Sequence, residues 1–353
     1  MEIKKEVFGT LSDGSVASIY TVSNDEMSFS VTDFGCAITS ILVPDGKGGK
    51  TDVVLGYSTL TGYAEGTSSF GAVVGRFANR IGNAKFELEG KEYLLDVNSG
   101  TKDSLHGGFD RYEKKLWNSK MVSTKNGLGV CFTHVSHDME QGFPGNVKIE
   151  LTYTLNKDNQ IALKYKASTD KATPISLTNH SYFNLAGRGS INEHILQLNC
   201  PAYLEVNKAL IPTGKMISVE GTPFDFRQPK PIGKDIAKVA PGYDHCYVTE
   251  AYSEEIENAF DGDLKQVAEV REPVSGRAMR VYSDQIGIQL YTGNFLDNEL
   301  GRNGMRYNKH EAFCLETQCF PDTPNKKEFP SCILTPGEKY KALTVYEFIR
   351  WSH

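Results

Sequence analysis

A glutamate stands in an otherwise apolar and thiol-rich run towards the C-terminal end of the chain. The segment FCLETQCFPDTPN, residues 313 to 325, places Glu316 two positions after Cys314 and ahead of a proline-rich turn. Because side chains alternate along an extended strand, Glu316, Cys314 and Gln318 should share one face. Such a glutamate can be an exposed strand residue or one arm of a salt bridge. If it is partly desolvated, its pKa rises towards the value that a general base needs near neutral pH.

Two histidines are candidates for the matching acid or for ligand binding. His180 lies in ISLTNHSYFNLAG, where a polar stretch leads into an aromatic one that ends in glycine. His106 precedes two glycines in KDSLHGGF, and these either let the backbone approach a ligand or form a turn. A lone histidine such as His180 more often has a structural role than a functional one. The neighbours of each ring in the fold must therefore decide its role.

Four further polar residues interrupt segments that otherwise have the pattern of a core. Asn79 and Arg80 are adjacent in GRFANRIGN, Asp244 follows a Pro-Gly pair in PGYDHCYV, and Gln289 interrupts the apolar strand GIQLYTG. Arg80 can be a surface charge or can clamp hydroxyls or a carboxylate. Asp244 can be a turn residue. A buried Gln289 requires hydrogen-bonding partners.

Together these positions supply two histidines, two carboxylates, an arginine and two amides, all distant in the sequence. Several donors and acceptors combined with an acid and a base suit a sugar ligand. Zinc is a poorer match because the chain has no HxxxH or CxxC pair. Acyl transfer is disfavoured because no GxSxG motif is present. A zinc site and an acyl-transfer site are therefore both disfavoured.

The elements that must position these residues follow a period of two. Residues 147–167 alternate apolar and polar on both sides of NKDNQ, which predicts a hairpin with one buried face. Residues 85–97 repeat this pattern around a Glu-Gly-Lys turn, and residues 278–293 predict two more short strands around SDQ. Only residues 232–239 and 254–260 suggest a helical turn or two. The chain should be all-β and mainly antiparallel.

Turn signals recur along the whole length, and no linker or charge block divides the chain. We therefore expect residues 1–353 to form one large β-sandwich domain. The glycine-rich tract PDGKGGKT, residues 44–51, resembles a phosphate loop but has a proline where that motif needs its first glycine. A hairpin turn is the better interpretation of this tract.

The composition argues against several other classes of partner. The formal net charge of -6 is spread among interspersed charges, so no basic stripe is available for nucleic acid or anionic lipid. No apolar run approaches the roughly 18 residues of a membrane span, and the charged start MEIKKEVFGTLSDG does not match a signal peptide. The seven scattered cysteines are expected to be reduced and mostly buried. A cytoplasmic location follows as an expectation.

The motifs GRFANRI, SLHGG, TNHSYFNLAG, YDHCYV, GIQLYTGNF and LETQCFPDTPN, the last followed by FPSCILTPGEKY, occur in this order. This ordered set strongly resembles the aldose 1-epimerase (galactose mutarotase) family. The resemblance extends from FGCAITSILVPD to the YEF near the C-terminal end. It implies a large antiparallel β-supersandwich with few short helices, in agreement with the hairpin pattern.

The resemblance also implies a role for each candidate. It makes Glu316 the general base and His180 the general acid in the opening and reclosing of an aldose ring, a reaction without redox change that needs no nucleotide or metal. The base must be ionised while the acid is protonated, so we expect an ion-paired or hydrogen-bonded couple. His106 would lie near the ring oxygen and the anomeric centre. The remaining sugar-binding residues would be Asn79, Arg80, Asp244 and Gln289.

The expected partner is thus a small aldose such as galactose or glucose, bound by a monomer or a homodimer. One segment departs from the family pattern, because the RYEKKLW that follows HGGFD is longer and more charged than expected. A relative that acts on hexose 6-phosphates would need further cations, for which Arg76, Arg188 and Lys115 are candidates. Two further classes compete with the mutarotase interpretation: a sugar-binding protein without turnover and a metal-dependent β-barrel enzyme.

Overall fold

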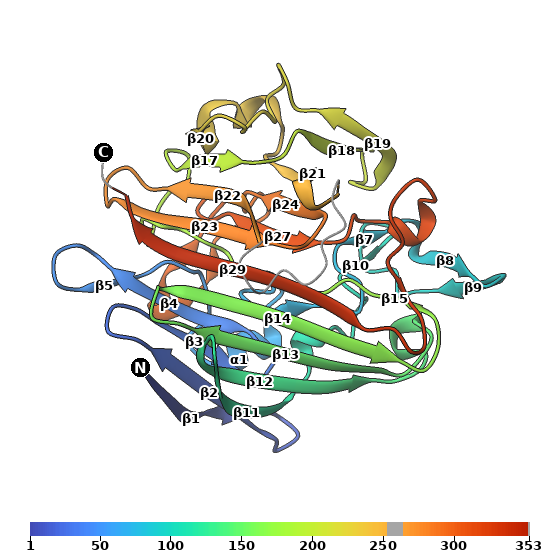
Figure 1. Ribbon diagram of the computed structural model, residues 1–353, viewed down its shortest axis with the longest axis horizontal. Coiled ribbons are helices and arrows are strands. Elements are labelled where there is room, and N and C mark those ends of the chain that lie inside the picture. The colour runs from blue at the N-terminus through green and yellow to red at the C-terminus, as the bar shows by residue number, and fades with distance from the viewer. Residues whose placement is uncertain (253–263, 352–353) are drawn as a thin grey trace.

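The computed structural model describes residues 1–252 and 264–351, and strands dominate this part of the chain (Figure 1). The largest sheet has nine strands, and every pairing within it is antiparallel. Its strands, in spatial order, are β11 (Asn118–Thr124), β12 (Gly127–Ser136), β13 (Val147–Leu155), β14 (Gln160–Thr169), β29 (Tyr340–Arg350), β23 (Arg277–Ser283), β22 (Lys265–Arg271), β17 (Ile195–Leu198) and β20 (Lys230–Pro231).

Two five-stranded antiparallel sheets accompany the large one. The N-terminal sheet has the order β1 (Glu2–Thr10), β2 (Val16–Ser23), β3 (Ser28–Thr32), β4 (Ile38–Pro44) and β5 (Lys50–Asp52). The other has the order β19 (Pro212–Ser218), β18 (Ala202–Val206), β21 (Asp244–Val248), β24 (Gly287–Tyr291) and β27 (Cys314–Gln318). The last three of these strands carry candidate site residues.

Five two-stranded ladders accompany the main sheets in the described residues. They pair β6 (Val73–Val74) with β16 (Thr178–Asn179), β7 (Arg80–Ile81) with β10 (Ser104–Leu105), β8 (Lys85–Leu88) with β9 (Lys91–Leu94), β15 (Thr173–Pro174) with β28 (Ile333–Leu334), and β25 (Glu299–Leu300) with β26 (Arg306–Tyr307). The described α-helix is α1 (Leu60–Glu65). The 3₁₀ turns are η1 (Gly82–Ala84), η2 (Tyr112–Lys114), η3 (Glu140–Gly142), η4 (Ile232–Lys234), η5 (Ile236–Lys238), η6 (Glu250–Tyr252), η7 (Arg302–Gly304) and η8 (Thr323–Asn325).

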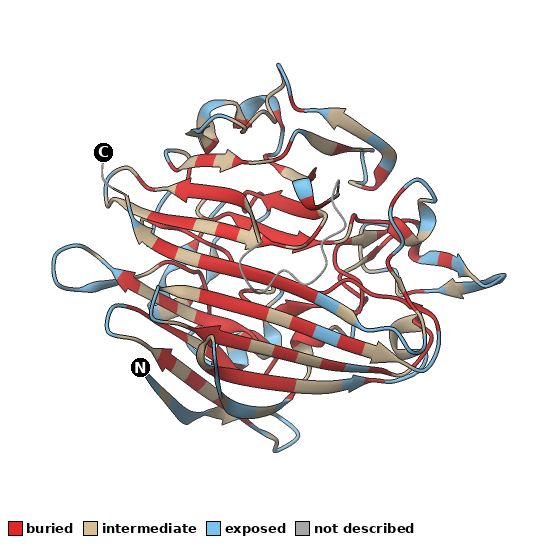
Figure 2. Ribbon diagram, viewed as in Figure 1, coloured by how far each residue is buried: buried red, intermediate tan, exposed pale blue. Residues whose placement is uncertain are grey.

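The predicted hairpin at residues 147–167 is confirmed as β13 paired with β14. Val147, Ile149 and Leu151 are buried, whereas Lys148 between them is exposed. This alternation gives β13 one core face and one outer face, visible as the banded colouring of the front strands in Figure 2. The pattern of residue types therefore sets which side of the large sheet turns inward.

The inward faces of the large sheet and of the N-terminal sheet share one hydrophobic core. Phe29 and Val31 of β3 belong to the same buried cluster as Leu151 of β13 and Tyr346 of β29. Burying apolar surface from two sheets against each other is the main stabilising term of a β-sandwich. The expected all-β sandwich architecture is thus confirmed.

The other structural expectations were met with one difference. Residues 85–97 form the β8–β9 hairpin, residues 44–51 form the turn between β4 and β5, and the described cysteines are free. The strands expected within 278–293 exist, but they are not partners: β23 pairs with β22 and β29, whereas β24 pairs with β21 and β27.

The two helical expectations have different outcomes. Residues 232–239 form the 3₁₀ turns η4 and η5. The helical turn expected at 254–260 lies outside the described residues. Within the described residues, the helices are all too short to cross a membrane.

Candidate active site

Three adjacent strands bring two carboxylates and an amide into one row. Gln289 on β24 is opposite Glu316 on β27 and, on its other side, opposite Cys246 on β21. Its Nε2 donates a hydrogen bond of 2.6 Å to Oδ1 of Asp244, which begins β21. Antiparallel pairing therefore collects residues that are far apart in the sequence onto one face of this sheet.

Two short ladders position the histidines. His180 directly follows β16; its backbone N–H donates to Ala72 O and its C=O accepts from Gly71 N, both at 2.9 Å. His106 directly follows β10, and its N–H donates to Asn79 O at 3.0 Å. The backbone N–H of Asn79 in turn donates to Nδ1 of the His106 ring at 3.2 Å. The His180 backbone is thus fixed at two points, and His106 is fixed once through its backbone and once through its ring.

The same hydrogen bond defines the protonation of the His106 ring. Because Nδ1 accepts a hydrogen bond from a backbone N–H, Nδ1 carries no proton. The ring is therefore neutral, and Nε2–H remains as its donor. Burial lowers the pKa of His106 well below its usual value, and the nearby charge of His180 lowers it further. His106 is therefore suited to donate a hydrogen bond to a sugar oxygen rather than to transfer a proton.

These residues surround a cavity of about 250 Å³, which is small among ligand sites and suits a single sugar ring. Six of the seven predicted residues line it: Asn79, Arg80, His106, His180, Asp244 and Glu316. Gln289 does not line the cavity, but its hydrogen bond orients Asp244, which does. Size alone would not identify the site, since a hollow of about 560 Å³ lies among residues 221–235. The combination of an acid, a base and hydrogen-bonding groups identifies the smaller cavity as the site.

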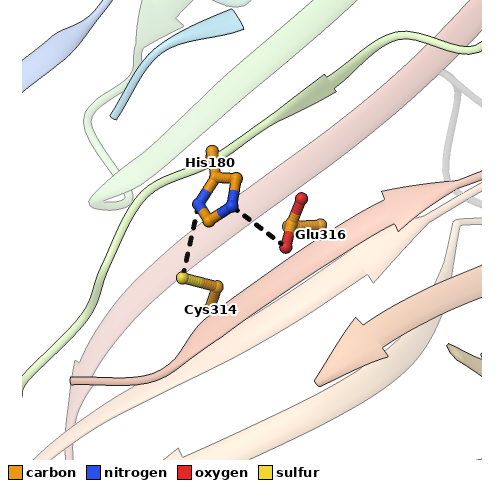
Figure 3. A group of neighbouring side chains, drawn as sticks. All are labelled: His180, Cys314 and Glu316. Atoms are coloured by element: carbon orange, nitrogen blue, oxygen red, sulfur yellow. Dashed lines mark hydrogen bonds and ion pairs between the residues drawn. The ribbon is translucent and has the colours of Figure 1, made fainter. Parts of the chain in front are cut away.

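Glu316 is buried against His180. The carboxyl is 2% exposed, its Oε1 lies 3.6 Å from His180 Nε2, and its Oε2 has no hydrogen-bond partner within the described residues (Figure 3). Burial raises the pKa of Glu316 to about 8; the charge of Asp244 raises it further and that of Arg80 opposes the rise. The interpretation of Glu316 as an exposed strand residue is therefore excluded.

The pKa of His180 moves in the opposite direction. Burial lowers it to about 4, and the positive charge of Arg111 adds to this effect. In the unliganded protein the pair therefore holds one proton near neutral pH, and burial places it on Glu316. We expected an ion-paired or hydrogen-bonded couple, and of these the ion pair is the less stable arrangement of that proton, because charge separation is costly in a desolvated site.

Cys314 completes a row of three groups. Its Sγ lies 3.5 Å from His180 Nδ1, on the ring edge away from Glu316 (Figure 3). The ligand atoms of these three residues lie within 4.8 Å of one another. Metal ligands must converge on one point, whereas this ring presents its two nitrogens to different partners. The arrangement is that of a row of neighbouring groups, in which the hydrogen bond to the thiol can fix the orientation of the imidazole.

Arg80 and Asp244 form the opposite side of the site. Arg80 Nη2 lies 3.8 Å from Asp244 Oδ2, and both side chains are mostly buried. Burial raises the pKa of Asp244, while Arg80 and the Gln289 hydrogen bond lower it. This pair offers both donors and an acceptor, as required for neighbouring sugar hydroxyls.

Comparison with known proteins agrees with this geometry. The family model for aldose 1-epimerase matches residues 18–347. The chain belongs to the aldose 1-epimerase family. It is 42% identical to galactose mutarotase from Rattus norvegicus over 353 residues, covering 99% of both chains. It is 35% identical to aldose 1-epimerase from Escherichia coli (strain K12) over 347 residues, covering 96% of both.

Solved structures agree with this membership. A crystal structure of an aldose epimerase homologue from C. elegans superposes with a TM-score of 0.84 at 30% identity, over 94% of this chain and 98% of that one. Family membership identifies the protein as an isomerase with mutarotase activity, the interconversion of the α and β anomers of an aldose.

Several residues that line the site of this aldose 1-epimerase were missed by sequence reasoning. Tyr182 stacks on the His180 ring, with centroids 4.9 Å apart, and Tyr291 packs edge-on against Tyr182. The sequence contained a signal for both tyrosines. Tyr182 lies two positions after His180, and Tyr291 lies two positions after Gln289, which is the spacing of side chains on one face of an extended segment. Arg111, from the charged segment after His106, also lines the cavity.

The three cations considered for a phosphorylated sugar lie elsewhere. Arg76 is 1% exposed and donates to Pro144 O and Thr173 Oγ1, among other groups, so it has a structural role. Arg188 is exposed, and Lys115 is paired with Asp110 and Glu140. None of the three lines the cavity.

Proposed function

We propose that this aldose 1-epimerase interconverts the anomers of free aldohexoses such as galactose and glucose, with Glu316 as general base and His180 as general acid. The observation that carries this proposal is the buried Glu316 carboxyl, which faces His180 and has an Oε2 without a hydrogen-bond partner in the described structure. A buried polar atom without a partner is costly unless a ligand satisfies it. The anomeric hydroxyl of a sugar is such a ligand.

Ring opening uses the ion-paired form of the couple. Ionised Glu316 removes the proton from the anomeric hydroxyl O1, the C1–O1 bond becomes a carbonyl, and the bond between C1 and the ring oxygen O5 breaks. Protonated His180 gives its proton to O5. This leaves an open-chain aldehyde, protonated Glu316 and neutral His180, so that one proton has been taken up and one given.

Reclosure reverses these transfers. After rotation about the C1–C2 bond, O5 attacks the other face of C1 while His180 takes the O5 proton and Glu316 returns a proton to O1. The neutral couple favoured by burial is the form that accompanies the open-chain aldehyde. Burial therefore stabilises the intermediate state of the couple and makes its ion-paired form more reactive.

The other residues bind the ring in this proposal. His106 donates to an oxygen near the anomeric centre, while Asn79, Arg80 and Asp244 bind sugar hydroxyls and Gln289 orients Asp244. Tyr182 and Tyr291 give the cavity apolar surface for the C–H groups of the sugar. The reaction as written needs no metal or cofactor. A cytoplasmic location and a monomeric or homodimeric state remain part of the proposal.

Polarimetry tests this function. Freshly dissolved α-D-galactose and α-D-glucose should relax to their equilibrium rotation faster with the protein than without it. Galactose is the first choice because the relative from Rattus norvegicus is a galactose mutarotase. If folded protein accelerates neither sugar, the proposed substrates are wrong and a sugar-binding protein without turnover becomes the better interpretation.

A further inference from the structure

A charged pair whose arginine lines the cavity has no role in the reaction as proposed. Arg111 lines the cavity, and its Nη2 lies 2.7 Å from Glu113 Oε1. The Glu113 side chain is 3% exposed, and within the described residues its carboxylate has no hydrogen-bond partner beyond this ion pair. The remaining N–H groups of Arg111 make no hydrogen bond in the described part of the chain, although an arginine has five donors.

The loop that carries this pair is firmly held. Lys114 Nζ donates to Tyr63 O at 2.9 Å and to Gly66 O at 2.5 Å. Trp117 Nε1 donates to Tyr112 O at 3.2 Å, and the Trp117 ring is buried. The positions of Arg111 and Glu113 are therefore fixed before a ligand arrives, as a specificity determinant requires.

The location of Arg111 indicates which part of a sugar it meets. Arg111 lines the cavity with His106 and His180, and its positive charge lowers the pKa of both rings, whereas the cation that lowers the pKa of Glu316 is Arg80. Arg111 therefore lies towards the histidine end of the cavity. In the proposed mechanism His180 protonates the ring oxygen O5. The atom bonded to O5 on the side away from the anomeric carbon is C5, which in an aldohexose carries the C6 hydroxymethyl group. A sugar bound in this orientation would carry that substituent on the side of the cavity where Arg111 lies.

We propose that Arg111, held in place by Glu113, is a specificity determinant that recognises the 6-hydroxyl of the sugar. The hydroxyl oxygen accepts a hydrogen bond from the Arg111 guanidinium, while Glu113, which does not line the cavity, fixes that guanidinium from behind. A hydroxyl can accept this bond, whereas a 6-methyl group or a missing C6 leaves the guanidinium donors unsatisfied. Glu113 also neutralises Arg111, so the pair offers no net positive charge to a 6-phosphate or a 6-carboxylate.

This inference rests on the proposed function and is tested by comparing three sugars with the same ring configuration. D-Galactose has a 6-hydroxyl, D-fucose has a methyl group in its place, and L-arabinose lacks C6. Polarimetry should give the wild-type protein a kcat/KM for galactose about 10- to 100-fold above that for either analogue, the value of one charge-assisted hydrogen bond. Equal values for the three sugars would overturn the proposal.

Variants separate recognition from folding. Arg111→Gln, and Arg111→Gln combined with Glu113→Gln to avoid a lone buried charge, should lower kcat/KM for galactose towards that for fucose. The value for fucose should change by less than about threefold. Ratios between sugars also cancel any change in the pKa of the histidines. Lys115→Gln, in the same loop but outside the cavity, should keep the wild-type ratio.

Two results would contradict the role of Arg111. Either an equal loss for all three sugars, which indicates a structural role, or an unchanged preference for galactose in both variants would overturn it. Failure of the proposed function itself looks different, because then the wild-type protein accelerates none of the three sugars.

Discussion

Replacing Glu316 with glutamine is expected to lower kcat for mutarotation by about 100- to 10,000-fold, the usual contribution of a positioned general base. Glutamine keeps the size of the side chain but cannot accept a proton from the anomeric hydroxyl. It also removes an ionisable group from a site where burial raises the pKa of the carboxyl to about 8. The fold should therefore be preserved while turnover is lost.

The Glu316 prediction is checked by polarimetry, with thermal unfolding as the test of folding. Glu150→Gln is a matched control, because Glu150 also lies on a strand but pairs with Lys166 outside the cavity. The control should have wild-type kcat. If Glu316→Gln turns over near the wild-type rate, the assignment of Glu316 as the general base is wrong.

His180→Gln is expected to cause a loss of similar size, because the ring oxygen then leaves without a proton donor. Glu316 and His180 share one catalytic proton, so the double variant should be about as slow as either single variant. His137→Gln, an exposed histidine outside the cavity, is the matched control and should be unchanged.

If the losses in kcat of the two single variants multiply in the double variant, the coupling of Glu316 and His180 is contradicted. Such losses would instead indicate that Glu316 and His180 contribute independently to catalysis. The residual rate must be compared with spontaneous mutarotation at the same pH and temperature, because that rate sets the lower limit of the measurement.

The sequence predicted the strands well, because their alternation reflects which face is buried. It predicted two hairpins correctly but not every pairing: β23 and β24 are separated by a short turn yet belong to different sheets. A connection between sheets and a hairpin can have the same local pattern, and only the long-range pairing with β27 and β29 distinguishes them. The positions of Asp244, Gln289 and Glu316 in one row depend on this pairing.

The candidate residues were found by their types and by the family resemblance, but their electrostatics were not. The pKa of Glu316 lies above that of His180 because both groups are buried. No local pattern of residues reveals that burial. Arg111 was missed because its place in the cavity depends on the anchoring of Lys114 to the distant segment Tyr63–Gly66. Arg76 suggested a phosphate cradle, yet it is buried and donates to backbone and hydroxyl oxygens.

The pH dependence of kcat/KM tests most directly whether Glu316 and His180 share one catalytic proton. Below pH about 4, His180 takes up a second proton while Glu316 still holds its own, so no base remains. Above pH about 8, Glu316 has lost the proton and His180 is neutral, so no acid remains. We predict a bell-shaped profile with a plateau between these limits, measured by polarimetry after subtraction of the spontaneous rate. A kcat/KM that continues to rise well above pH 8 would contradict the shared proton.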